Sequence, residues 1–280
     1  MMHRDVHGFF SQASKQMDIV RFDGLRGSQV KSDTVAVEEP LEIRVHGKAL
    51  VVTMRTPGHD PELAAGYLWS EGVIQEPWHI LEMAHCQDGP HLNDNILNVF
   101  LHPDVAIVPE CHERFSYAAS GCGLCGKSTI ESIQSHFPPL QSGFRVAASV
   151  LHGILASVQE RQCLFDQTGG VHAAALFRAD GSLVEIMEDV GRHNAVDKVI
   201  GAQLRGGDFP FEEGFLFVSS RASFEIVQKA CSARIPMIVC ASAPSSLAID
   251  FALANRQTLI GFLRDHRFNA YTYPERVEER

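Results

Sequence analysis

The chain has 280 residues, and its 24 Lys and Arg against 34 Asp and Glu give a formal charge of −10. This acidic balance argues against bulk attraction to nucleic acid or to an anionic membrane, because both attractions need a positive surface. The sequence has no apolar run long enough to span a membrane and no signal-peptide pattern near Met1, so we expect a cytoplasmic protein. The seven cysteines lack the even spacing of a secreted disulfide scaffold, and we expect them to be reduced thiols.

The predicted elements of the first half form a β-rich unit. We expect the aperiodic residues 1–30 to be poorly ordered. A hairpin follows, then a helix that Asp60 caps and that ends at Gly72, and then two further strands. We assign these elements, with the cysteine-containing loop and helix after them, to an N-terminal domain of residues 31–140. Its strands are predicted at 41–45, 50–54, 80–86 and 95–101.

After residue 140 the pattern changes to alternating helices and strands, which is typical of a largely parallel sheet covered on both faces. We assign this α/β domain to residues 141–274, and we expect the charged tail 275–280 to be poorly ordered. Its helices are predicted at 147–158, 194–204, 223–233 and 245–255, and its strands at 171–178, 182–189, 215–219, 237–241 and 258–263.

The most informative segment lies near the end of the first domain, where residues 120–128 read Ser-Gly-Cys-Gly-Leu-Cys-Gly-Lys-Ser. Glycines surround Cys122 and Cys125, and an amphipathic helix pattern begins at Ser128. The free N–H groups and the dipole at a helix N-terminus favour a thiolate over a thiol, and Lys127 adds a positive charge nearby. The residues therefore predict a nucleophilic thiol on a glycine-rich loop.

Other chemistries fit the same segment less well. Gly121–Ser128 matches the phosphate-loop pattern G-x-x-x-x-G-K-[ST], but the polar residues 111–118 before it are not the buried strand that such a loop follows. A zinc site would need two more ligands besides the two thiols. Cys111 and His112 are the nearest source of them, and no second closely spaced cysteine pair exists, so zinc is the weaker hypothesis.

A second motif surrounds His172. This histidine matches the H-x-E motif of zinc deaminases, but Ala174 stands where the motif has glutamate. Residues 219–223, where P-C-x-x-C would supply two zinc thiolates, read Ser-Ser-Arg-Ala-Ser. The pattern allows a deaminase-like scaffold without its hydrolytic metal centre, and His172 is either a ligand contact or a hydrogen-bonded core histidine.

Polar junctions between elements are further candidate sites. Asp189, Arg192 and His193 surround a glycine where a strand meets a helix, and a solvated turn is the alternative interpretation. Arg221 opens a helix whose N-terminus could bind phosphate, or it is a surface arginine. Residues 262–267 combine two arginines, a histidine and an aromatic ring, which is typical of a clamp for an anionic, ring-bearing ligand; an ordinary basic turn is the alternative.

Five segments taken together resemble one family, that of the formate dehydrogenase accessory sulfurtransferase FdhD. The likeness runs in the right order over about residues 34–273, which is more specific than any single motif. The five segments are Arg55–Gly66, Gly121–Gly126, Thr168–Ala175, Glu188–Lys198 and Ser223–Glu225.

This resemblance implies a sulfurtransferase that acts through a cysteine persulfide. A cysteine desulfurase would load sulfur onto Cys122. The sulfur would then pass to the molybdenum or tungsten bis(molybdopterin guanine dinucleotide) cofactor, Mo-bis-MGD, which formate dehydrogenase needs for activity. Cys125 would be a resolving or relay group.

The resemblance also implies a fold, an assembly and a ligand site. The expected fold is α/β, with a cytidine-deaminase-like layered α/β/α domain and a smaller N-terminal β-rich α+β domain. A homodimer is expected, with no intrinsic metal and no nucleic-acid or membrane partner. The implied cofactor-binding residues are Phe262, Leu263, Arg264, Asp265, His266 and Arg267.

Two competing functions belong to other classes. A cofactor chaperone that carries no sulfur would depend on Arg264 and Arg267 but not on Cys122. A phosphate-loop nucleotide hydrolase would depend on Lys127.

Overall fold

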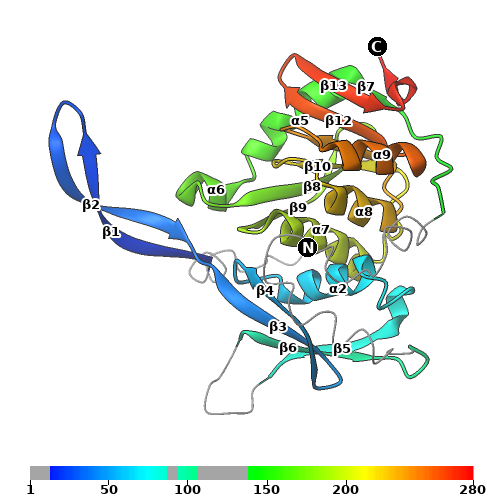
Figure 1. Cartoon of the computed structure of the whole chain (residues 1–280), viewed down its shortest axis with the longest axis horizontal. Coiled ribbons are helices and arrows are strands. Elements are labelled where there is room, and N and C mark those ends of the chain that lie inside the picture. Colours follow the sequence, from blue (N-terminus) through cyan, green and yellow to red (C-terminus); the bar gives the residue numbers. More distant parts are fainter. Residues whose placement is uncertain (1–12, 87–93, 106–137, 280) are drawn as a thin grey trace.

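The computed structural model describes residues 13–86, 94–105 and 138–279. The segment with Cys122 and Cys125, and the helix predicted from Ser128, lie outside the described residues. Figure 1 shows a long two-stranded arm, a small unit built on a four-stranded sheet and a larger unit built on a six-stranded sheet. Within the described ranges, no helix combines the length and the apolar character needed to cross a membrane.

The small unit follows from alternating apolar residues and one helix. Its sheet has the order β4-β3-β6-β5, and Leu41, Ile43 and Val45 on β3 point to the same buried side. The helix α2 (Asp60–Ser70) covers that side with Leu63 and Leu68. This confirms the four predicted strands and the predicted helix. The strands are β3 (Glu39–Val45), β4 (Lys48–Arg55), β5 (Ile80–His85) and β6 (Ile96–Leu101), with the short 3-10 helix η1 (Pro77–His79) before β5.

The start of α2 differs from the prediction that Asp60 caps the helix. His59 takes the cap position in a left-handed conformation with φ of 57°, and Asp60 is the first helical residue. The Asp60 carboxylate is drawn instead to the guanidinium of Arg55, whose Nε lies 2.9 Å from Oδ1. A charge-assisted bond of this kind is stronger than a neutral bond to a backbone N–H, which explains the shift.

The large unit contains a mixed sheet with the order β13-β12-β11-β10-β8-β9. β10, β11 and β12 are parallel, whereas β8, β9 and β13 join by antiparallel pairs. The prediction of a largely parallel sheet was therefore wrong, because β8–β9 and β12–β13 are hairpins rather than crossovers. The strands are β8 (His172–Arg178), β9 (Leu183–Asp189), β10 (Gly214–Val218), β11 (Met237–Cys240), β12 (Thr258–Arg264) and β13 (Arg267–Thr272).

Helices cover both faces of this sheet, as predicted. Leu216 and Val218 on β10 face one core, and Phe215 and Phe217 face the other, as the two-residue period of a strand requires. Three helices pack on the first face and α5 packs on the second (Figure 1). The helices are α5 (Ala148–Gln159), α7 (Arg192–Gly206), α8 (Phe224–Ser232) and α9 (Ser246–Ala254), and a short helix α6 (Cys163–Thr168) precedes β8.

The two units are joined by a close crossing of α2 and α7. A Cβ built on Gly66 would lie 1.9 Å from the carbonyl oxygen of Asp197, and one built on Gly201 would lie 1.9 Å from that of Glu62. Only glycine permits backbones to approach this closely. Trp69 adds a hydrogen bond from its indole N–H to the carbonyl of Ser232, 2.9 Å away.

Both ends of the described chain are more regular than predicted. Residues 14–30 were expected to be poorly ordered, but β1 (Ser14–Asp23) and β2 (Gly27–Ala36) form a continuous antiparallel arm. The tail beyond Glu275 was also expected to be poorly ordered. It contains the 3-10 helix η3 (Pro274–Arg276) and β14 (Val277–Glu278), which pairs with β7 (Val146–Ala147). Pairing between backbones, which apolar periodicity does not register, explains both corrections.

Candidate functional site

The polar junctions named from the sequence gather at one edge of the six-stranded sheet. β9, β10, β11 and β12 all end at this edge, and β8 begins there with His172, opposite Asp189. Ligands of open α/β sheets bind outside the carboxyl ends of the strands, so the placement is that of a ligand site. We call this region the carboxyl edge.

Asp189 is a buried anchor within the carboxyl edge. Its side chain has no exposed surface, and its Oδ2 lies 2.7 Å from the ammonium of Lys198, which is also fully buried. The other oxygen, Oδ1, accepts hydrogen bonds from the Gly191 N–H at 2.8 Å and from the Asn194 amide at 3.1 Å. The alternative of a solvated turn is therefore wrong for Asp189.

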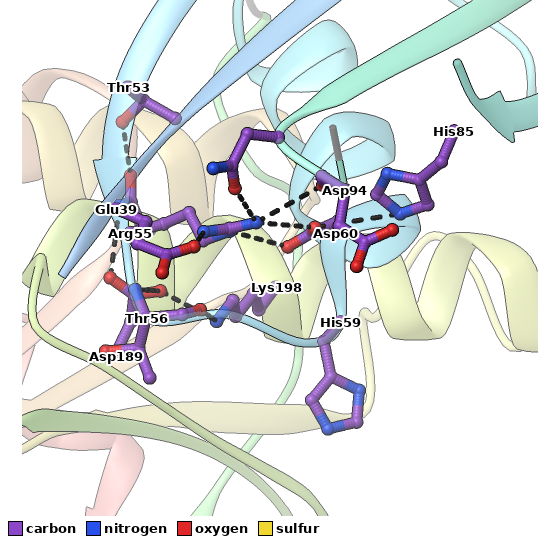
Figure 2. A network of polar contacts seen from close by, with 12 residues as sticks. Glu39, Thr53, Arg55, Thr56, His59, Asp60, His85, Asp94, Asp189 and Lys198 are labelled. Carbon is purple, nitrogen blue, oxygen red and sulfur yellow. Dashed lines mark hydrogen bonds and ion pairs between the residues drawn. The ribbon is translucent and has the colours of Figure 1, made fainter. Parts of the chain in front are cut away.

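Figure 2 shows that the same aspartate ties the segment Arg55–Gly66 to the carboxyl edge. The Thr56 N–H donates to Asp189 Oδ2 at 3.2 Å, and Lys198 Nζ donates to the Thr56 carbonyl at 2.9 Å. Val190 N–H donates to the Thr56 hydroxyl at 3.1 Å. Two of the segments that carry the family resemblance are thus one interlocked network.

Arg55 extends this network into the small unit. Its guanidinium makes two hydrogen bonds to the Asp60 carboxylate, at 2.9 and 3.0 Å, and one to the Asn95 side chain at 2.9 Å (Figure 2). His85 Nε2 lies 3.7 Å from the second Asp60 oxygen. Arg55 is 1% exposed and Asp60 is 4% exposed, so this buried ion pair holds structure in place.

Beside the buried anchor, three basic side chains approach one another. His193 Nε2 lies 2.7 Å from the Glu225 carboxylate and 3.2 Å from the Ser223 hydroxyl. These two contacts join the start of α7 to the start of α8. His172 is partly buried, and burial together with Arg192 and His193 lowers its pKa, while Asp189 opposes the shift. His172 is therefore neutral at physiological pH, which suits a hydrogen-bonding residue better than a fixed cation.

The residues Phe262–Arg267 form the tip of the β12–β13 hairpin at the same edge. Phe262 has a left-handed backbone with φ of 55° and a side chain that is 41% exposed. Arg264 Nη1 donates to the carbonyls of Ala241 at 2.6 Å and Leu263 at 2.7 Å, which fixes the guanidinium in place. Asp265 and His266 form the exposed turn between the strands.

One of the six implied cofactor residues points the wrong way to touch a ligand with its side chain. Leu263 is fully buried in the core between the sheet and α5. Its neighbours Phe262, Arg264 and Arg267 line a surface pocket of about 270 Å³ together with Asn269. Sequence reasoning missed Asn269, although its position two residues after Arg267 on a strand places both on one face.

The hairpin and the histidine cluster are parts of one extended edge. Three strand spacings separate β12 from β8, which corresponds to about 15 Å. The pocket of about 270 Å³ beside the hairpin therefore occupies only one end of this edge.

The described cysteines differ sharply in their surroundings. Burial raises the pKa of Cys231 to about 12 and that of Cys240 to about 11. Both are therefore thiols at neutral pH and pack as small buried hydrophobes. Cys163, at the start of α6, is exposed. The predicted catalytic pair, Cys122 and Cys125, lies outside the described residues.

Most of this chain matches the model of one known protein family. The model of the FdhD/NarQ family matches residues 36–278, which include every element from β3 to β14. The chain belongs to the FdhD/NarQ family.

Two curated FdhD relatives are similar over nearly their whole length. The sulfur carrier protein FdhD of Streptomyces coelicolor is 45% identical over 258 residues, covering 88% of this chain and 90% of that protein. The sulfur carrier protein FdhD of Mycobacterium tuberculosis is 43% identical over 255 residues, covering 88% and 92%.

A solved structure shares the fold of this FdhD/NarQ chain. The crystal structure of a formate dehydrogenase accessory protein from Desulfotalea psychrophila superposes with a TM-score of 0.76 at 26% identity. The match covers 95% of this chain and 100% of that one. The mixed α/β architecture of this chain is therefore shared with that accessory protein.

Proposed function

We propose that this chain is a sulfur carrier that serves formate dehydrogenase, with Cys122 as the residue that carries the sulfur. The observation that carries the proposal is the family match over residues 36–278, together with relatives named sulfur carrier protein FdhD that are 43–45% identical. The sequence of residues 120–128 adds a glycine-flanked thiol of the kind such chemistry requires.

The transfer begins with a persulfide on a cysteine desulfurase. The Cys122 thiolate attacks the terminal sulfur of that persulfide, a new S–S bond forms on Cys122, and the donor cysteine leaves as a thiolate. No net oxidation occurs in this step, because one S–S bond replaces another. Cys122 then carries the extra sulfur as a persulfide.

Delivery to Mo-bis-MGD requires that the carried sulfur gain two electrons. Attack of the Cys125 thiolate on the inner sulfur of the Cys122 persulfide supplies them, because it releases hydrosulfide and leaves a Cys122–Cys125 disulfide. The molybdenum or tungsten cofactor is the substrate that receives this sulfide. Reduction of the disulfide by a cellular dithiol would restore the pair.

The carboxyl edge supplies a site for the cofactor in this proposal. The exposed ring of Phe262 offers a stacking surface for guanine, and the guanidinium groups of Arg264 and Arg267 suit phosphate oxygens. Leu263 supports the hairpin from within the core, and Asp265 and His266 shape its turn. The α/β/α layers, with His172 at the same edge, support the predicted cytidine-deaminase-like layering of the domain.

The partners and place of action complete the proposal. A cysteine desulfurase is the donor, formate dehydrogenase apoenzyme is the destination of the cofactor, and the protein is a homodimer that works in the cytoplasm. A cofactor chaperone without sulfur transfer is the second candidate, because the pocket beside Arg264 and Arg267 would serve it equally well.

Complementation of a bacterial strain that lacks its own FdhD separates the two functions. We expect Cys122→Ala to abolish formate dehydrogenase activity, because no other residue can take the sulfur at that position. Cys163→Ala, which removes an exposed thiol on α6, is the matched control and should support normal activity. Full activity of Cys122→Ala together with loss of activity in Arg264→Ala and Arg267→Ala would favour the chaperone instead.

A further inference from the structure

A cleft larger than the hairpin pocket lies between the base of the β1–β2 arm and the start of α2. Its volume is about 830 Å³, which is within the usual range of ligand sites. Four parts of the described chain line it: residues 14 and 15 of β1, residues 35–39 at the junction of β2 and β3, residues 55 and 57–61 at the entry to α2, and His85 with Asp94. We call it the arm-base cleft.

Acidic side chains outnumber permanent cations around the arm-base cleft. Among the described residues that line it, the permanent cations are Lys15 and Arg55, and the carboxylates are Glu38, Glu39, Asp60 and Asp94. Asp60 is paired with Arg55 at 2.9 Å, whereas Glu38 and Asp94 are exposed. We call Glu38, Glu39 and Asp94 the acidic rim. The rim repels an anionic ligand and favours a neutral or cationic one.

Two buried polar atoms in the lining of the arm-base cleft, Arg55 Nη1 and His85 Nδ1, have no hydrogen-bond partner in the described part of the chain. Arg55 is 1% exposed, and its Nη1 lies 3.5 Å from the Glu39 carboxylate, beyond the usual length of a hydrogen bond. His85 Nε2 lies 3.7 Å from the Asp60 carboxylate (Figure 2), which favours a proton on Nε2 and leaves Nδ1 as an acceptor. A buried donor and a buried acceptor are thus left unpaired, and a ligand that pairs with both is stabilised.

A basic peptide matches both the polarity and the charge of the arm-base cleft. Its backbone supplies a carbonyl acceptor for Arg55 and an N–H donor for His85. The Glu39 side chain is 46% exposed, so it can rotate from Arg55 toward a cationic side chain while the carbonyl takes its place at Nη1. Lysine or arginine in the same segment is attracted by the acidic rim.

We propose that the arm-base cleft is a docking site for an extended basic segment of a partner protein. The backbone of that segment bonds to Arg55 and His85, and its lysine or arginine side chains lie against the acidic rim. The inference does not depend on sulfur transfer, because none of the residues that carry it belongs to the proposed carrier or cofactor site.

Binding of a labelled peptide to the full chain tests this proposal. The probe is a fluorescein-labelled, end-blocked octapeptide of alternating glycine and arginine, and its fluorescence anisotropy is measured at low ionic strength. The double variant E38Q/D94N removes two exposed charges from the acidic rim and should weaken binding about fivefold. The control E160Q/D250N removes two exposed charges from the large unit and should bind the peptide as tightly as wild type.

Competition with spermine separates recognition of the backbone from attraction of charge alone. Spermine is a polycation like the peptide, but it has no carbonyl group to accept a hydrogen bond from Arg55. It should displace the labelled peptide at least about tenfold less effectively than the unlabelled peptide does. The proposal would be overturned by a wild-type chain that binds no peptide up to about 1 mM, by equal affinities of the two double variants, or by equal displacement with spermine.

Discussion

Neighbouring charges and burial give His172 its chemical state. Arg192 and His193 face it from the first turn of α7, and Asp189 faces it across the β8–β9 pair. Burial and the two basic residues dominate, so the pKa of His172 is lower in the folded protein than in the unfolded chain. A neutral imidazole can donate from one nitrogen and accept at the other, which suits a residue that lines a ligand edge.

This shift predicts how stability depends on pH. Below about pH 6.5 His172 becomes protonated in the unfolded chain but stays neutral in the folded protein. The free energy of unfolding therefore decreases as pH falls from that value through the folded pKa. We therefore expect His172→Gln to lose less stability than wild type between about pH 7.5 and 5.5, with a difference below about 1.4 kcal/mol per pH unit. Urea unfolding of both proteins at each pH is the measurement, and parallel pH dependence would contradict the assignment.

The elements of this protein were predictable where local pattern decides them. Apolar alternation located β3 and helical spacing located α5, because each buries one regular face. A continuous apolar run located β8, which is buried on both faces of the sheet. The arm was missed because its apolar side chains face outward among polar ones, so its sequence resembles that of a disordered segment.

The candidate site was predictable in its parts but not in its assembly. Charged and aromatic residues at 188–194 and 262–267 indicated two sites. Their meeting at one sheet edge depends on strand order, which the sequence does not reveal. The burial of Leu263 depends on contacts between segments that are distant in the sequence. The hydrogen bond between Arg55 and Asp60 forms in place of a helix cap, and the sequence does not show which of the two the carboxylate makes.

The α2–α7 crossing provides a sharp test at the scale of elements. Gly201→Ala would place a Cβ about 1.9 Å from the Glu62 carbonyl, so the helices must separate, and we expect a loss on the order of 3 kcal/mol in the free energy of unfolding. Gly153→Ala on α5 is the matched control, because its new Cβ meets nothing within 4 Å. Removing this helical glycine should stabilise by roughly 0.5–1 kcal/mol. Equal effects of the two substitutions in chemical denaturation would contradict the close crossing.

At the scale of the whole molecule, packing between the small and the large unit holds the carboxyl edge in place. The small unit packs through α2 on α7, and α7 begins at the carboxyl edge. The network of Arg55, Thr56, Asp189 and Lys198 fixes this arrangement with buried ion pairs and hydrogen bonds. The carboxyl edge is therefore a rigid platform, which suits the anionic cofactor that we propose it binds.

The central claim is that sulfur resides on Cys122 during transfer, and intact-protein mass spectrometry tests it directly. After incubation with a cysteine desulfurase and cysteine, the wild-type chain should gain about 32 Da, reversible by a dithiol and located on Cys122 by peptide mapping. Cys163→Ala should gain the same mass and Cys122→Ala should not. An unmodified wild-type chain, or a gain that persists in Cys122→Ala, would contradict the account.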